Sequence, residues 1–277
     1  MRIACHGITW GQENFRTAID EVAALGFRGF ETFASVMDDY QGDKLAKFQQ
    51  LLKERGLELV ALYGGGNMHV ASEVDAIIAR NLRIAQFLSL NGANRLVLGP
   101  GRRGTQAPTL QELDTLVACA TEIGTQTAEF GVLACLHPHI NTVVESIDEI
   151  DYVFDRLDPA VVAVAADTAH FAKGNPSVSG AETKLFAKYV DRIKYVHLKD
   201  WNPNLPPEAT GEGGTAIIRD FVELGEGRVD LRGCIDILRA HDYPGWITIE
   251  LDYTRRTPYK SVAMSKRYLV NELGLSV

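Results

Sequence analysis

The sequence is poor in cysteine and has no long apolar segment. Only four of its 277 residues are cysteines, Cys5, Cys119, Cys135 and Cys234, and no two of them form a Cys-x-x-Cys pair. This pattern argues against a disulfide framework and fits a reducing compartment. No apolar run approaches the roughly 20 residues needed to span a bilayer, and residues 1–11 lack the apolar segment of a signal peptide. We therefore expect a cytoplasmic protein that does not bind a membrane.

Clusters of basic residues are also missing. The formal net charge is −8, and Lys and Arg are spread along the chain. Because a protein that binds nucleic-acid phosphates needs a basic face, nucleic acid is not an expected partner. The sequence has no linker, low-complexity tract or short internal repeat either, so we expect one domain over residues 1–277.

Short apolar runs alternate with longer amphipathic stretches along the chain. Eight runs are rich in Val, Ile and Leu and mostly lack alternation, which is typical of strands buried on both faces: residues 2–8, 28–33, 57–63, 94–99, 131–137, 161–167, 193–198 and 245–251. Eight strand-then-helix units in a chain of this length predict a single (β/α)8 TIM barrel of the α/β class. A doubly wound open sheet is the alternative, but it usually has fewer strands, and no Gly-x-Gly-x-x-Gly follows the first run.

Some helix boundaries can also be predicted. Thr109 with Glu112 three residues later forms a capping box, and the helix that it starts is expected to stop at Gly131. Ser72 is the expected N-cap of another helix. Residues 201–227 form the longest irregular stretch, and a connection of that length is often a lid or a binding loop.

In a barrel of this kind, reactive groups lie at the C-terminal ends of the strands. Five of the seven histidines come at or just after an expected strand end, another follows the third strand, and only His241 precedes a strand. Carboxylates accompany them at Glu31, Asp167, Asp200 and Glu250. The sequence therefore predicts a polar site at one end of the barrel.

Four of these residues form a candidate site for one metal ion: His137, Asp167, His197 and Glu250. Simpler explanations exist, since Asp167 could cap the following helix, His197 could be a hydrogen-bonded core residue and His137 could contact substrate. Glu250 argues most for an ion, because Glu is rarely buried unpaired and a cation removes the cost of its charge. Mixed imidazole and carboxylate ligands suit Mn²⁺ or Co²⁺, which we expect, or Zn²⁺, Fe²⁺ or Ni²⁺, better than Mg²⁺ or Ca²⁺.

Other groups at this end could contact a substrate. His139 follows His137 across the rigid Pro138, and we expect it to face the substrate. Trp10 and Trp201 follow the first and seventh strands and could stack on a sugar or cyclitol ring.

Two glycine-rich loops, residues 63–69 and 99–105, could cradle a phosphate beside Arg102 and Arg103. Neither loop matches a P-loop. The alternative is a permissive turn that carries two exposed arginines.

Several motifs together resemble a known family. The stretches "HPHINTVVES", "ADTAHFAKGNP", "YVHLKDW", "LGEGRVDLRGCIDIL" and "YPGWITIELD" are similar to the xylose isomerase-like TIM barrels, which include sugar isomerases, epimerases and endonuclease-IV-like proteins. Within that family, "HPH" resembles the branch of myo-inosose (2-keto-myo-inositol) dehydratases. The resemblance implies a metal-dependent enzyme that acts on a small cyclitol or sugar, and it leaves homo-oligomer formation open.

The resemblance also implies roles for single residues. Asp167, His197 and Glu250 match three metal ligands of the family. The fourth ligand is usually a glutamate, and His137 stands at that position here. His170 matches a residue that contacts substrate hydroxyls in the relatives.

The chemistry implied by the resemblance begins with a metal that polarises a ketone and its neighbouring hydroxyl. A base then removes the α proton, an enediolate forms, and loss of a β hydroxyl gives dehydration. We expect this reaction for a polyhydroxy cyclic ketone such as 2-keto-myo-inositol. The candidate proton carriers are His139 first, then Glu31, His170 and Lys199, with His6 as a further substrate contact.

Other functions stay open on the sequence. A ketose isomerase or 3-epimerase would use the same metal, and a glutamate in place of His137 would favour it. A non-catalytic cyclitol-binding barrel would tolerate loss of the proton carriers. Nuclease activity is not favoured, because the additional ligands of the endonuclease branch cannot be placed and the net charge is acidic.

Overall fold

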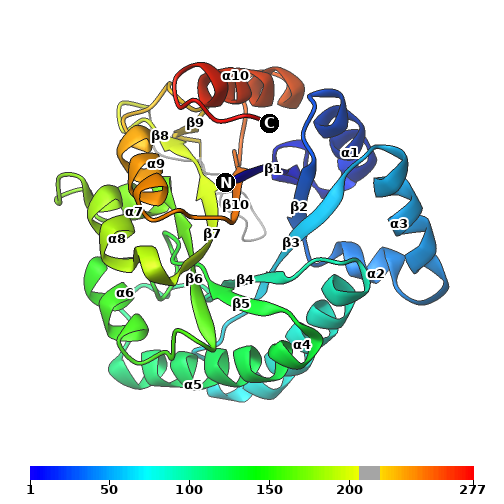
Figure 1. Ribbon diagram of the computed structural model, residues 1–277. Coiled ribbons are helices and arrows are strands. Elements are labelled where there is room, and N and C mark those ends of the chain that lie inside the picture. The colour runs from blue at the N-terminus through cyan, green and yellow to red at the C-terminus, as the bar shows by residue number, and fades with distance from the viewer. Residues whose placement is uncertain (206–218) are drawn as a thin grey trace.

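Eight parallel strands close into a barrel in the computed structural model, which describes residues 1–205 and 219–277 (Figure 1). Around the ring the order is β1-β10-β7-β6-β5-β4-β3-β2. The strands are β1 (Arg2–His6), β2 (Gly29–Phe33), β3 (Glu58–Gly65), β4 (Arg95–Gly99), β5 (Leu133–Leu136), β6 (Val162–Asp167), β7 (Ile193–Leu198) and β10 (Trp246–Ile249). The predicted (β/α)8 barrel is confirmed, and the eight expected strands differ from these by at most two residues at either end.

Helices surround the strands, as Figure 1 shows. The α-helices are α1 (Phe15–Ala24), α2 (Val36–Tyr40), α3 (Leu45–Glu54), α4 (Val74–Leu90), α5 (Leu110–Thr127), α6 (Ile147–Phe154), α7 (Thr168–Gly174), α8 (Ala181–Tyr189), α9 (Leu231–Ala240) and α10 (Pro258–Asn271). Short 3-10 helices are η1 (Gly7–Trp10), η2 (Gln12–Asn14), η3 (Gly42–Lys44), η4 (Ala71–Glu73), η5 (Ala128–Phe130) and η6 (Val190–Arg192). In the described part of the chain, no helix is long and apolar enough to cross a membrane.

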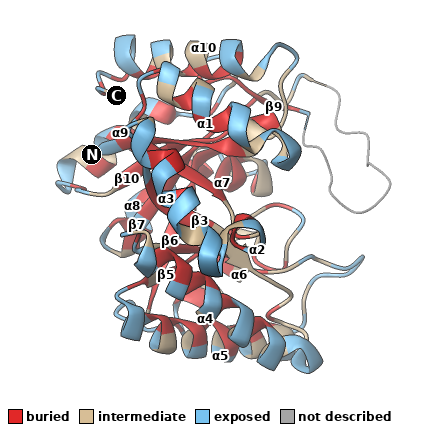
Figure 2. Cartoon of the chain, turned by 90° about the vertical axis from the view of Figure 1, so that its right-hand side faces the viewer, coloured by how far each residue is buried: buried red, intermediate tan, exposed pale blue. Residues whose placement is uncertain are grey.

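Buried residues lie on the strands and on the helix faces that pack against them (Figure 2). They form two apolar clusters, one between strands and helices and one inside the barrel. The inner layer consists largely of small side chains such as Ala4, Ala61, Ala163 and Ala165. Small residues leave room at the barrel axis for Tyr195, which is fully buried there. The inner layer therefore provides a packed floor beneath the polar residues at the strand ends.

The predicted helix start at Thr109 and helix end at Gly131 are confirmed, whereas the predicted N-cap at Ser72 is wrong. The capping box of Thr109 and Glu112 is confirmed at the start of α5, and Gly131 ends η5 with a φ of +70°. Ser72 is not an N-cap, because it lies within η4 and α4 begins after Glu73 without a side-chain cap.

The long stretch 201–227 is partly regular. β8 (Asp200–Trp201) and β9 (Phe221–Val222) pair antiparallel beside the barrel. The sequence did not indicate this small sheet. Residues 206–218, the centre of the expected lid or binding loop, lie outside the described residues.

Candidate functional site

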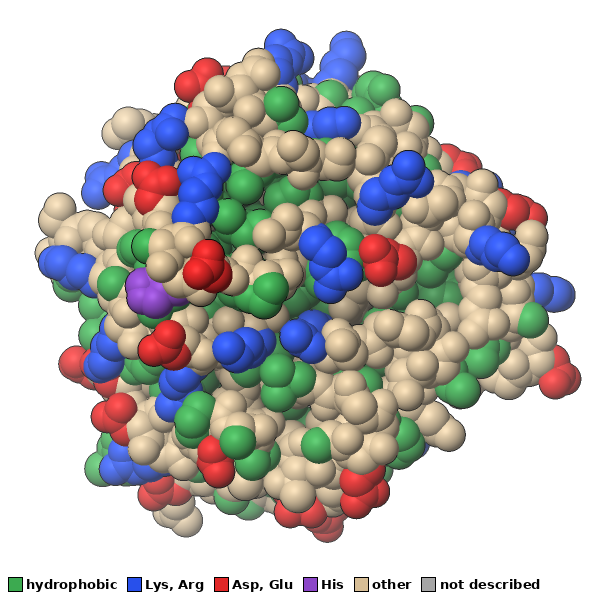
Figure 3. All heavy atoms as spheres, in the orientation of Figure 1, with side chains coloured by type: hydrophobic (Ala, Val, Ile, Leu, Met, Phe, Trp, Pro, Cys, Tyr) green, Lys and Arg blue, Asp and Glu red, His purple; other side chains and the backbone are tan. Residues whose placement is uncertain are grey.

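The polar residues expected at strand ends gather at the C-terminal end of the barrel. β5, β6, β7 and β10 are neighbours in the ring, so His137, Asp167, His197 and Glu250 at their ends come together, and all four are buried. Figure 3 shows the opposite, amino-terminal end, where charged and apolar side chains are scattered over the surface and little histidine is visible. His241, which precedes β10, is exposed.

His197 lies at the centre of this cluster. Its Nε2 lies 2.9 Å from Glu31 Oε2, so Nε2 donates a proton to that carboxylate and Nδ1 is the nitrogen that faces the site. Burial alone would lower the pKa of His197, but Glu250 and Glu31 raise it well above its ordinary value, so without a metal ion Nδ1 also holds a proton. Nδ1 lies 2.7 Å from Glu250 Oε2 and 3.9 Å from Asp167 Oδ2. None of these three atoms has a hydrogen-bond partner among the described residues. A proton on Nδ1, or a metal ion in its place, would offset the negative charge of these buried carboxylates, and an imidazole nitrogen with carboxylate oxygens is a common metal-binding set.

His137 contributes a further lone pair. Its Nδ1 lies 3.2 Å from the carbonyl oxygen of Ala165, so Nδ1 carries the proton and Nε2 is free. One ligand atom each from His137, Asp167 and His197 lies within 4.8 Å of the other two. A metal-binding histidine usually donates its second N–H to a carboxylate or carbonyl, and both histidines do so here. The donor set fits a divalent ion.

Asp167 serves two purposes with its two oxygens. Oδ1 accepts hydrogen bonds from the backbone N–H groups of Ala169 and His170, both at 2.8 Å, and so caps α7. The capping role considered from the sequence is therefore present, but it leaves Oδ2 free to face His197. Burial raises the pKa of Asp167 to about 6.

Lys199 is a buried cation beside these carboxylates. Its Nζ lies 2.7 Å from Asp252 Oδ1, 3.2 Å from Glu250 Oε1 and 3.7 Å from Asp167 Oδ2. Burial alone would lower the pKa of Lys199, but Asp252, Glu250 and Asp167 together raise it. The ammonium group is thus charged at neutral pH, and it can donate a proton but not accept one.

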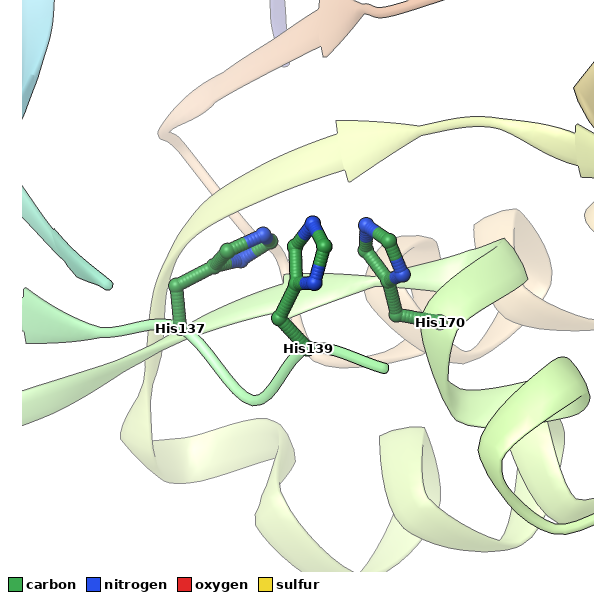
Figure 4. Close-up of side chains that lie close together, drawn as sticks. All are labelled: His137, His139 and His170. Carbon is green, nitrogen blue, oxygen red and sulfur yellow. The ribbon is translucent and has the colours of Figure 1, made fainter. Parts of the chain in front are cut away.

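His139 and His170 lie next to His137, with their rings facing the same space (Figure 4). The ring centroids of His139 and His170 are 3.6 Å apart. His139 Nδ1 lies 2.6 Å from the carbonyl oxygen of Ile140, which leaves Nε2 as a proton acceptor. His170 Nε2 lies 3.3 Å from Lys199 Nζ and accepts from it, which leaves Nδ1–H as a donor that has no partner among the described residues.

Burial keeps both of these rings neutral. It lowers the pKa of His139 to about 4 and that of His170 well below its ordinary value. His137, His139 and His170 also have ligand atoms within 4.8 Å of one another. That second group contains no carboxylate to offset the charge of a cation, so the group with Asp167 is the better metal site.

Glu31 and His6 stand on the other side of His197. Glu31 Oε2 accepts from the Tyr195 hydroxyl at 2.7 Å as well as from His197, whereas Oε1 has no hydrogen-bond partner among the described residues. His6 Nδ1 accepts the backbone N–H of Ile8, so its Nε2 carries the proton, 3.9 Å from Glu31 Oε1. Glu31 therefore orients His197, while His6 presents a donor.

The sequence reasoning missed Tyr195, Thr248 and Asp252. The Tyr195 hydroxyl bridges Glu31 and Thr248, whose Oγ1 is 2.6 Å away, and Asp252 pairs with Lys199. Alternation along β7 could have indicated Tyr195, because residues two apart on a strand share a face. Asp252 lies beyond the end of β10, so strand alternation gives no signal for it.

Three residues that follow strands at this end of the barrel have partners other than a substrate or metal ion: Trp10 and Trp201, which were expected to contact substrate, and Asp200. The Trp10 indole N–H donates to Glu21 at 2.6 Å, and the Trp201 indole N–H donates to Asp220 at 2.8 Å. Both rings are buried, and this packing does not support the expected stacking on a substrate ring. Asp200 accepts four backbone N–H groups, from Trp201, Gly225, Gly227 and Val229, and so fixes the loop before α9.

Comparison with known proteins agrees with this architecture. Residues 19–268 match the xylose isomerase-like TIM barrel family. An inosose dehydratase of Clostridium botulinum (strain Alaska E43 / Type E3) is 27% identical, over 96% of this chain and 92% of its own. An inosose dehydratase of Halalkalibacterium halodurans is also 27% identical, but the match covers 61% of this chain and only 57% of that protein.

Solved structures share the fold at lower identity. The probable 3-DHS dehydratase AsbF, involved in petrobactin synthesis in Bacillus anthracis, has a TM-score of 0.78 at 16% identity and covers 98% of this chain and 99% of its own. The IolI protein with a bound zinc atom has a TM-score of 0.75 at 15% identity, with both chains fully covered. With the family match spanning most of the sequence, the chain belongs to the xylose isomerase-like TIM barrel family.

Proposed function

We propose that the protein is a metal-dependent hydro-lyase that dehydrates a polyhydroxy cyclic ketone such as 2-keto-myo-inositol. The observation that carries the proposal is the convergence of buried ligand atoms at the C-terminal end of the barrel: one each from His137, Asp167 and His197 within 4.8 Å of one another, with Glu250 Oε2 2.7 Å from His197 Nδ1. The inosose dehydratases among the relatives support the choice of reaction.

The four side chains suit an ion such as Mn²⁺, Co²⁺ or Zn²⁺. Bound there, the ion would polarise the ketone and its neighbouring hydroxyl as a Lewis acid. Burial alone would raise the pKa of Glu250, but His197 and Lys199 hold it well below its ordinary value, so this carboxylate is ionised and able to bind a cation. Glu31 fixes the ring of His197 so that Nδ1 faces the site.

Dehydration of a β-hydroxy ketone needs one group that takes the α proton and another that protonates the departing hydroxyl. His139 Nε2 is an acceptor and His170 Nδ1–H is a donor, on adjacent rings. We assign these two roles to them, with an enediolate of the substrate between the steps. Lys199 sets the proton position on His170 by donating to its Nε2. The α proton and the hydroxyl leave as water, and the product is a diketone.

The test is incubation of Mn²⁺-loaded protein with 2-keto-myo-inositol while the ultraviolet absorbance of the diketone is followed. H197A should lose both bound metal, measured by mass spectrometry, and turnover. H241A is the matched control, because His241 is exposed at the opposite end, and it should keep both. Full metal content in H197A would refute the metal site. Turnover of a free ketohexose without diketone formation would replace dehydration with ketose isomerisation or 3-epimerisation.

A further inference from the structure

The C-terminal end of the barrel also contains a cavity to which the proposed reaction assigns no role. A cavity of about 400 Å³ lies over the C-terminal ends of β2, β3 and β4, next to β5, the first of the strands that carry the metal site. Small-molecule sites usually enclose about 300–1,000 Å³. Its walls include Phe33, Tyr63, Thr142 and the turns around Gly65 and Gly101.

This cavity adjoins the candidate metal site directly. The Tyr63 ring packs edge-on against His137, with 5.7 Å between ring centroids. The Thr142 hydroxyl donates to the carbonyl oxygen of His139 at 2.6 Å. A ring ketone held between His137 and His139 would therefore extend one edge into the cavity.

The cavity walls are held in place by close backbone packing. Gly65 has a φ of +88°, and a Cβ at this position would lie 2.2 Å from the carbonyl oxygen of Gly99. Gly101 has a φ of +99° and packs against the backbone of Asn67 in the same way. The buried Asn81 amide bonds both the N–H and the carbonyl of Gly65. The glycines thus lock the two turns together and give the cavity a fixed shape.

Two arginines give this cavity a positive charge. Arg80 from α4 and Arg102 after β4 both line it, and the described lining residues include no Asp or Glu. Neither guanidinium has a hydrogen bond or ion pair with a described residue. The adjacent Arg103 differs, since it pairs with Glu145 and Glu149. Both arginines are exposed where they line the cavity. In a chain of net charge −8, two guanidinium groups at one cavity without a lining carboxylate favour an anionic ligand.

We propose that the cavity is the subsite for an anionic substituent of the substrate, so that the ring ketone carries a carboxylate or a phosphate bound by Arg80 and Arg102. The planar guanidinium group matches the geometry of both anions. This inference rests on the proposed function for the ketone chemistry, and it adds the charge and position of the substituent. A neutral cyclitol would be the poorer ligand.

Binding calorimetry with three ring probes tests the proposal: neutral myo-inositol, myo-inositol 1-phosphate, and the ring carboxylate quinate. The wild-type protein should bind one charged ring at least about ten-fold more tightly than myo-inositol, which corresponds to 1.4 kcal/mol. R80A/R102A should lose this preference, and R80K/R102K should keep part of it because charge remains without the planar fork. R83A is the matched control, since Arg83 is exposed on the same helix but does not line the cavity, and it should bind as wild type. The preferred probe identifies the anion.

Equal affinity for neutral and charged rings would overturn the subsite, as would a preference that survives R80A/R102A. Wild-type turnover separates this result from the proposed function. Dehydration of 2-keto-myo-inositol without any anion preference refutes the subsite alone. Arginine-dependent anion binding by a protein that dehydrates no ring ketone supports the subsite and refutes the reaction.

Discussion

Removing the charge of Lys199 should reveal how much the buried carboxylates depend on a cation. K199M keeps the apolar stem but deletes the ammonium group, which is fully buried and lies within 3.7 Å of Asp252, Glu250 and Asp167. Deleting one partner of a buried ion pair leaves an uncompensated charge. We therefore expect the metal-free protein to lose about 3–5 kcal/mol of unfolding free energy at about pH 8.

The loss should shrink when another positive charge reaches the site. A divalent ion between Asp167 and Glu250 would leave chiefly Asp252 uncompensated, whose side chain is 12% exposed, and the expected loss falls to about 1–3 kcal/mol. Lowering the pH should also reduce the loss of unfolding free energy caused by K199M. Because burial raises the pKa of Asp167 to about 6, this carboxyl is protonated at about pH 5 and no longer needs a countercharge.

Urea denaturation followed by circular dichroism measures these differences, with EDTA or Mn²⁺ present and at both pH values. The matched control is K188M, because the Lys188 ammonium lies 2.7 Å from Asp151 but its side chain is 48% exposed. Such a surface pair contributes about 0–1 kcal/mol. If K199M in EDTA loses no more unfolding free energy than K188M, the argument from buried charge is wrong.

Three further predictions concern the fold and the metal-free site. G65A should lower the free energy of unfolding by more than about 3 kcal/mol, because its Cβ would clash with the carbonyl oxygen of Gly99. G92A is the control, since Gly92 also has a positive φ but no atom nearby, and it should lower the free energy of unfolding by about 1–2 kcal/mol. Equal losses in urea denaturation would contradict the clash. T109A should lower the free energy of unfolding by about 1 kcal/mol through loss of the α5 capping box, and T125A, at an exposed position within the same helix, by less than about 0.5 kcal/mol in the same measurement. Because the pKa of Asp167 is raised to about 6, its ionisation in the folded protein lowers stability as the pH rises through about 6. In EDTA, the melting temperature of wild type should therefore fall between about pH 4.5 and 7.5, and that of D167N should fall less. Parallel profiles of melting temperature against pH would contradict this.

Local sequence patterns were sufficient to predict the barrel and the end of it that carries the site. Each strand is marked by its own apolar run, and the strands are parallel, so their C-terminal ends meet at one edge whatever the details of packing. This is why His137, Asp167, His197 and Glu250 could be grouped although up to 113 residues separate them. The Thr109 capping box could be predicted because it involves only four consecutive residues.

Which side chains pair with one another depended on the tertiary structure. Glu31 and His197 form a hydrogen bond across 166 residues of sequence, and only the closed ring brings β2 close enough to β7. The direction of a loop side chain is equally hidden in the sequence. Arg102 and Arg103 are adjacent and chemically identical, yet one lines the cavity and the other pairs with Glu149. The sequence determined which residues reach the mouth of the barrel, and the folded backbone decided which way each of them points, because that depends on contacts between segments distant in the chain.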